Sequence, residues 1–132
     1  MHDKTSCAQT RTPVQYDIWE ARLSKKNVGS RHVQVKVRPV IVISNNSANT
    51  HSPVLTVVPM TSKRKRPLPT HVVLDQTGIA DERDRTAVST ALCENILSLD
   101  KENLIRHLGT LSEQDEKALA RAILVQLGME EH

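Results

Sequence analysis

Two short apolar runs, Val40–Ile43 and Val54–Val58, constrain the fold of this chain more than any other feature. Both are rich in β-branched residues, which suit a pleated, half-buried surface, and the polar segment between them has the composition of a loop. They therefore predict two antiparallel strands. Arg38 stands just before the first run and Thr61 just after the second. Antiparallel pairing would bring these two side chains to the same end of the sheet, which is the candidate site.

The length of 132 residues fits one domain with a substantial core. We expect residues 1–14 to be a disordered tail, because they are polar and lack periodicity, and residues 15–129 to form the domain. The first residues lack the apolar core of a signal peptide, and no run approaches the roughly 20 apolar residues of a membrane helix. We therefore expect a soluble, cytoplasmic protein with no membrane partner.

The first half of the chain reads mainly as strand. A short strand is predicted at Tyr16–Leu23, with Trp19 as a core residue in preference to a base-stacking one. Ser24–Ser30 reads as a turn. From His32 to Arg38, valines alternate with polar or cationic residues, which indicates a strand with two different faces. Pro39 lacks a backbone donor and belongs at an edge or a bulge.

The second half mixes strands and helices. We predict a strand at Thr70–Leu74, a solvated linker at Gln76–Arg85 and strand over part of Ala87–Leu99. A short helix with Asp100 as its N-cap is expected to end just before Gly109. A second helix is expected to begin at Ser112 and end before Gly128, with an apolar stripe against the sheet that includes Ala118, Leu119 and Leu127. The fold class is mainly β with α (α+β).

The basic residues gather in one half of the chain, and Lys63–Arg66 is a continuous block. Such a concentration favours an anionic partner such as nucleic acid, although a merely solvated face has the same composition. The chain has one tryptophan, Trp19, one tyrosine, Tyr16, and no phenylalanine. Recognition of a nucleic acid would therefore depend on charge and hydrogen bonds more than on stacking.

The residues do not suggest a metal or a cofactor. The six histidines are scattered, Cys7 and Cys93 do not make a zinc framework, and there is no glycine-rich phosphate loop. Metal-free cleavage of RNA fits such a chain, because the substrate brings its own nucleophile, the 2′-hydroxyl. Arg38 would stabilise the charge on the phosphate and Thr61 would orient it. From these residues alone, the simpler interpretation is that Arg38 is an ordinary surface arginine and Thr61 an ordinary threonine at a strand end.

Several segments together resemble the MazF/PemK (Kid) family of toxin endoribonucleases. VRPVIVISNN, TVVPMTS, LPTHVVL and LCENILSLDKENLIRHLGTLS occur in the family's order, over roughly Tyr16 to Gly128. The resemblance implies an SH3-like barrel of the CcdB/PemK type with a C-terminal helix, and a homodimer. It also implies the toxin of a type II toxin–antitoxin system, bound by a cognate MazE-like antitoxin. Its activity would be metal-independent, sequence-specific cleavage of single-stranded mRNA to 2′,3′-cyclic phosphate and 5′-hydroxyl ends.

By the same resemblance, Arg38 and Thr61 are the expected catalytic residues. The segment after Gly29 lacks the family's glycine pair, and Asn95 stands where the family has glutamine. His32 is an alternative proton shuttle. The expected RNA-binding residues are Ser30, Arg31, His32, Lys36, Ser62, Lys63, Arg64, Lys65, Glu94 and Asn95.

Two other functions remain open at this point. Related folds include CcdB-type toxins, which bind gyrase and do not cut RNA. A catalytically degenerate RNA-binding relative is the other alternative, because the family's glycines are missing.

Overall fold

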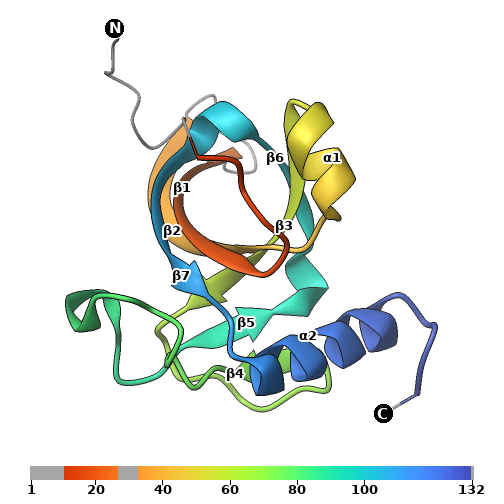
Figure 1. The fold of residues 1–132 in the computed structure, drawn as a ribbon. Helices are drawn as coiled ribbons and strands as arrows, with labels where there is room; N and C mark the ends of the chain where they lie inside the picture. Colours follow the sequence, from red (N-terminus) through yellow and green to blue (C-terminus); the bar gives the residue numbers. More distant parts are fainter. Residues whose placement is uncertain (1–10, 27–32, 132) are drawn as a thin grey trace, which may run out of the picture.

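The computed structural model describes residues 11–26 and 33–131, which form an antiparallel sheet curled into an open barrel (Figure 1). The order of its strands is β4-β5-β3-β2-β1-β7, and β6 also pairs with β3. The helix α2 lies beside β4, outside the barrel (Figure 1). The strands are β1 (Asp17–Lys26), β2 (Val33–Val42), β3 (Val54–Thr61), β4 (His71–Val73), β5 (Thr90–Leu92), β6 (Leu97–Asp100) and β7 (Leu104–Thr110). The helices are α1 (Asn46–His51) and α2 (Glu113–Gln126), and single 3₁₀ turns occur at η2 (Glu82–Asp84), η3 (Cys93–Asn95) and η4 (Lys101–Asn103).

The predicted pairing of the two apolar runs is confirmed. β2 and β3 are antiparallel, and their ladder ends where Val40 lies opposite Pro59. Arg38 and Thr61 each lie two residues beyond that pair, at the same end of the two strands. Pro39, just outside the ladder, pairs only with Glu20 of β1. At Pro39, β2 is thus locally an edge, as its missing donor requires.

The core consists of two apolar clusters, and the first three strands contribute to both. Ile18, Ile41 and Val58 belong to the cluster beneath α2. Their neighbours Trp19 and Val57 belong to the other cluster. Successive strand residues point to opposite faces, so these strands are buried on both sides. Trp19 is fully buried, which confirms it as a core residue.

The prediction of a helix after Asp100 is wrong, because this segment is the turn η4 followed by strand β7. Leu104 and Leu108 are both buried, and their spacing of four satisfies the period of a strand as well as that of a helix. β1 supplies the ladder that decides between the two, with Asp17 opposite Thr110. Asp100 makes no side-chain cap.

Two segments predicted as loops contain regular secondary structure. The polar segment between β2 and β3 contains α1, because the side chain of Asn45 accepts a hydrogen bond from the Ala48 N–H at 2.9 Å and caps it. The predicted turn at Ser24–Ser30 begins too early, since β1 continues to Lys26. The remainder of that turn lies outside the described residues.

The helix beginning at Ser112 is confirmed. The Ser112 hydroxyl accepts a hydrogen bond from the Asp115 N–H at 3.2 Å, and Leu119 is fully buried against the sheet. Ala118 and Leu127, which the apolar stripe included, are exposed. No helix in the described ranges is long and apolar enough to span a membrane.

The N-terminal segment joins the fold before β1. Residues 1–10 lie outside the described part of the chain, whereas Pro13 is buried and the Val14 N–H donates to the Asp17 carboxylate at 2.9 Å.

The segment from Gln76 to Arg85, predicted as a solvated linker, is packed onto β7. Ile79 is buried, and the Ala80 N–H donates to the Leu108 carbonyl at 3.0 Å. The Thr110 N–H donates to the Gly78 carbonyl at 3.1 Å. The prediction was wrong because this contact depends on residues some 30 positions further along the chain, which local composition does not reveal.

This packing makes Gly78 a sensitive position. A Cβ atom there would lie 1.5 Å from the Thr110 carbonyl oxygen, so Gly78→Ala should lower the free energy of unfolding by about 2 kcal/mol or more. Gly128→Ala is the matched control: a Cβ atom there meets nothing within 4 Å, and only the backbone φ of 72° opposes it, at about 1 kcal/mol. Urea denaturation of both variants measures the difference. Equal losses would contradict the close packing.

Candidate functional site

An open groove with a volume of about 750 Å³ lies at the end of β2 and β3 where Arg38 and Thr61 stand. Both residues line it. The groove also receives side chains from β1, from the loop 62–66, from the segment 76–89 and from the region between β5 and β6. Buried apolar residues such as Met60 and Ile79 contribute to its lining. The pairing of β2 with β3 therefore brings Arg38 and Thr61 into one groove.

The hydroxyl of Thr61 is oriented by the loop that follows it. The Lys63 N–H donates to Thr61 Oγ1 at 3.2 Å. Because this bond occupies one lone pair of the oxygen, the hydroxyl proton stays available to an acceptor in the groove. Arg38 is exposed, and the proline after it restricts its backbone to an extended conformation. Both side chains are thus presented to a ligand by a constrained backbone.

The groove has an excess of positive charge near Arg38 and Thr61. Lys36, Lys63 and Lys65 line it together with Arg38. Within the described ranges, none of these four cations forms an ion pair. Unpaired cations gathered in a groove attract an anionic ligand.

Not every predicted site residue reaches the groove. Ser62 and Asn95 line it, together with the cations named above, whereas Arg64 and Glu94 do not. Ser30, Arg31 and His32, including the alternative proton shuttle, lie outside the described residues.

Glu94, a predicted RNA-binding residue, makes hydrogen bonds within the protein. Its carboxylate accepts hydrogen bonds from Thr70 Oγ1 at 3.1 Å and from His71 Nε2 at 2.8 Å. Partial burial acts to raise the pKa of Glu94, but the hydrogen bonds from His71 and Thr70 outweigh it, and the net pKa is lowered. Glu94 thus fastens η3 to β4, and η3 carries Asn95 into the groove.

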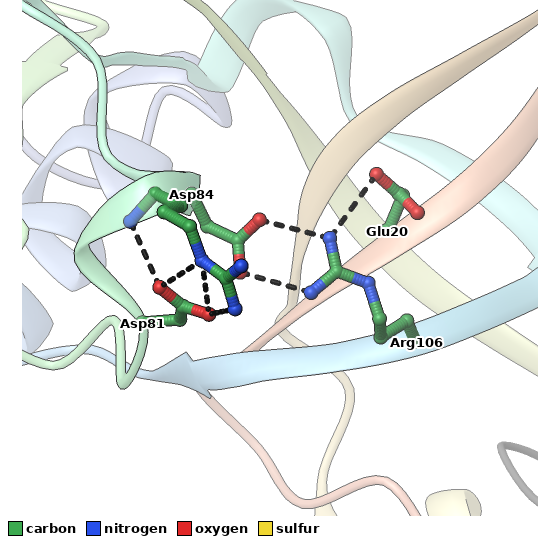
Figure 2. Close-up of polar contacts among 5 residues, drawn as sticks. Glu20, Asp81, Asp84 and Arg106 are labelled. Carbon is green, nitrogen blue, oxygen red and sulfur yellow. Dashed lines mark hydrogen bonds and ion pairs between the residues drawn. The ribbon is translucent and has the colours of Figure 1, made fainter.

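A network of charges that the sequence did not reveal holds the segment 76–89 beside the groove (Figure 2). Arg106 of β7 donates two hydrogen bonds to the Asp84 carboxylate, at 2.9 and 2.8 Å, and lies 3.7 Å from the Glu20 carboxylate. The Arg106 guanidinium lowers the pKa of Asp84. Arg83 pairs with Asp81 in the same turn. The only signal in the sequence was the cluster DERDR, whose partner Arg106 lies 22 residues beyond Asp84.

Within the same segment, Gln76 and Thr86 are hydrogen-bonded to each other, and both line the groove. The Gln76 side chain donates to the Thr86 carbonyl at 2.7 Å and accepts from the Thr86 N–H at 2.9 Å. Gln76 has a φ of 61°, a left-handed conformation that is unusual for a residue with a side chain. These two bonds offset its cost and fix the outline of the groove.

The described part of the chain contains no group of three or more His, Cys, Asp or Glu residues that could hold a metal ion. Cys93 is buried, and burial raises the pKa of its thiol to about 12. A thiol that stays protonated at neutral pH is a poor nucleophile. The groups that can act chemically in the groove are therefore a guanidinium, a hydroxyl and the surrounding charged and amide side chains.

Comparison with known proteins gives one consistent result. The family model for the PemK-like, MazF-like toxin of type II toxin–antitoxin systems matches residues 14–127. An endoribonuclease MazF from Staphylococcus saprophyticus is 34% identical over 114 residues, which cover 86% of this chain and 89% of that protein.

Solved structures agree with the sequence comparison. An endoribonuclease from a mycobacterial species has a TM-score of 0.70 at 20% identity, covering 92% of this chain and 97% of that one. A mycobacterial endoribonuclease in complex with its cognate antitoxin has a TM-score of 0.68 at 22% identity, covering 91% and 99% of the two chains. The fold expected from the resemblance, a mainly antiparallel β barrel of the CcdB/PemK type with a C-terminal helix, is confirmed.

The lowered pKa of Glu94 predicts a dependence of stability on pH. A carboxyl group whose pKa is lower in the folded state than in the unfolded state stabilises the protein above its unfolded pKa, and this contribution is lost as the pH falls through the folded value. Glu94→Gln should therefore be less stable than the wild type at pH 6, and the difference should shrink as the pH falls from about 5 to 3. Urea denaturation at several pH values measures it. A difference that does not change with pH would contradict this role for Glu94.

Proposed function

Because the chain belongs to the PemK-like, MazF-like toxins of type II toxin–antitoxin systems, we propose that it is an endoribonuclease that binds its RNA in the groove around Arg38 and Thr61. The observation that carries the proposal is the gathering of Arg38, Thr61 and unpaired lysines in one groove. Its substrate is single-stranded mRNA, which it cuts at specific sequences, arresting translation and growth.

The reaction follows from what these side chains can do. The 2′-oxygen of the RNA attacks the adjacent phosphorus atom and loses its proton, and the bond from phosphorus to the 5′-oxygen breaks. The products are a 2′,3′-cyclic phosphate and a 5′-hydroxyl, whose oxygen takes up a proton. The Arg38 guanidinium binds the phosphoryl oxygens, on which charge increases in the transition state. The Thr61 hydroxyl donates to the same phosphate and holds it in line. No step requires a metal ion.

The lysines of the groove extend this contact along the RNA. Lys36, Lys63 and Lys65 would neutralise phosphates on either side of the cut and release their counterions, so affinity should fall as salt increases. Ser62 and Asn95 add neutral hydrogen-bonding groups to the lining. Arg64 is exposed in the same loop and would meet the RNA outside the groove.

The remaining partners follow from the family and from the surface. The cognate partner is a MazE-like antitoxin, which inhibits by covering the basic groove with an acidic, disordered segment. The protein acts as a homodimer in the cytoplasm. The exposed Val35 and Val37 of β2 support association through this strand, since their side chains are 59% and 50% exposed.

The first test is Arg38→Ala, assayed on a long single-stranded RNA in the presence of EDTA, with the cut ends mapped by primer extension. Loss of a charged donor to the transition state should lower the cleavage rate by at least about 100-fold. Arg121→Ala is the matched control, because Arg121 is exposed on α2 and does not line the groove. Full cleavage by a folded Arg38→Ala would reject the site. Intact RNA with folded wild type would favour the gyrase-binding alternative.

A second test concerns the hydroxyl of Thr61. Thr61→Val keeps the β-branched shape that suits strand β3 and removes the donor, so the cleavage rate should fall by roughly 10- to 100-fold, less than for the charged Arg38. Thr61→Ser restores a hydroxyl and should recover most of the rate. Equal rates for the valine and serine variants would show that the hydroxyl takes no part.

A further inference from the structure

Glu20 is an acidic residue in a groove whose proposed ligand is polyanionic. It lines the groove together with Arg38 and Thr61, and it pairs across the strands with Pro39, the residue next to Arg38. A carboxylate repels phosphates, so it weakens binding unless it meets a hydrogen-bond donor of the ligand.

The carboxylate of Glu20 still has acceptor capacity. Its contact with Arg106 is 3.7 Å long, which is too long for a hydrogen bond. Arg106 instead gives two short bonds to Asp84. Among the described side chains, none donates a hydrogen bond to Glu20. Its side chain is 31% exposed, so a ligand in the groove can reach it.

The cation that Glu20 contacts is not one of the proposed phosphate-binding groups. The Glu20 carboxylate is turned toward Arg106, which is held by Asp84 of the segment 76–89 (Figure 2). The phosphate contacts proposed above come instead from Arg38, Thr61 and the lysines. Sequence-specific recognition of single-stranded RNA uses hydrogen bonds to the Watson–Crick edges of unstacked bases. An acidic residue that lines the groove is therefore suited to contact a base and not a phosphate.

The chemistry of a carboxylate selects one base. Both of its oxygens are acceptors, so it pairs best with two adjacent donors. Among the four RNA bases, guanine alone has two adjacent donors on its Watson–Crick edge, N1–H and the N2 amino group. Adenine, cytosine and uracil each place a donor beside an acceptor. Resting on the endoribonuclease function, we propose that Glu20 determines specificity by accepting two hydrogen bonds from a guanine near the cut.

The test compares wild type and Glu20→Gln on RNA with a randomised segment, with the cut ends sequenced. Wild type should require guanine at one fixed position near the cut. Glutamine offers one acceptor and one donor, so the variant should lose at least about 10-fold of the preference for guanine over the other bases. It should still cut RNA with other bases there. Inosine in place of that guanosine removes the amino donor, and it should slow wild type but not the variant.

Glu82→Gln is the matched control, because it makes the same change of charge at an exposed residue of η2 that does not line the groove. Its cut sites should be those of wild type. Wild-type cutting without a guanine requirement, or unchanged cut sites in Glu20→Gln, would overturn the proposal. So would an equal loss of rate at every site, which would indicate proton transfer by Glu20.

A binding experiment separates this inference from the proposed function. Selection of tight binders from a randomised RNA pool needs no cleavage, so it applies even if wild type cuts no RNA. Wild type should enrich guanine at one position and Glu20→Gln should not. Equal enrichment by the two proteins would overturn the role of Glu20, whereas guanine enrichment without cleavage would count against the nuclease function alone.

Discussion

The arrangement of the site depends on the register between β2 and β3, and burial on both faces fixes that register. Ile41 and Val58 lie opposite each other in one core cluster, while Val42 and Val57 lie opposite each other in the second. A slip of one residue would turn each of these side chains toward the wrong cluster. The core thereby determines that Arg38 and Thr61 end up at one end of the same two strands. Neither residue needs a contact with the other, because the apolar residues behind them set their positions.

Much of the fold could be predicted because local patterns and tertiary packing agree. The alternation around Val35, the β-branched run ending at Val58 and the cap at Ser112 each occur in the element that they predict. The segment Leu104–Thr110 could not be assigned in this way. Its two buried leucines fit either period, and only its pairing with β1, which is distant in the sequence, makes it a strand. The helix α1 was missed because its cap is formed by Asn45 inside a stretch whose composition is typical of loops.

The candidate site, like the fold, could be predicted from the sequence only in part. Arg38, Thr61 and the basic loop could be located from the sequence, since strand ends and a continuous block of charge are local features. The roles of Glu94 and Arg106 could not be located, because each depends on a partner more than 20 residues away. Glu94 is itself a predicted site residue, and in the structure its carboxylate holds η3 against β4. Charged residues near a site can thus support its shape through contacts that the sequence does not reveal.

The pairing of β1 with β7 has a consequence for the synthesis of the chain. Asp17 lies opposite Thr110, and the Leu111 N–H donates to the Tyr16 carbonyl at 3.0 Å. Closing a loop of about 90 residues has a length-dependent entropic cost of about 4 kcal/mol, which only the completed set of contacts offsets. A nascent chain that still lacks β7 can form the β2–β3 ladder but not the β1–β7 pairing. The β1–β7 pairing, and with it the full outline of the groove, therefore forms only after β7 has been translated.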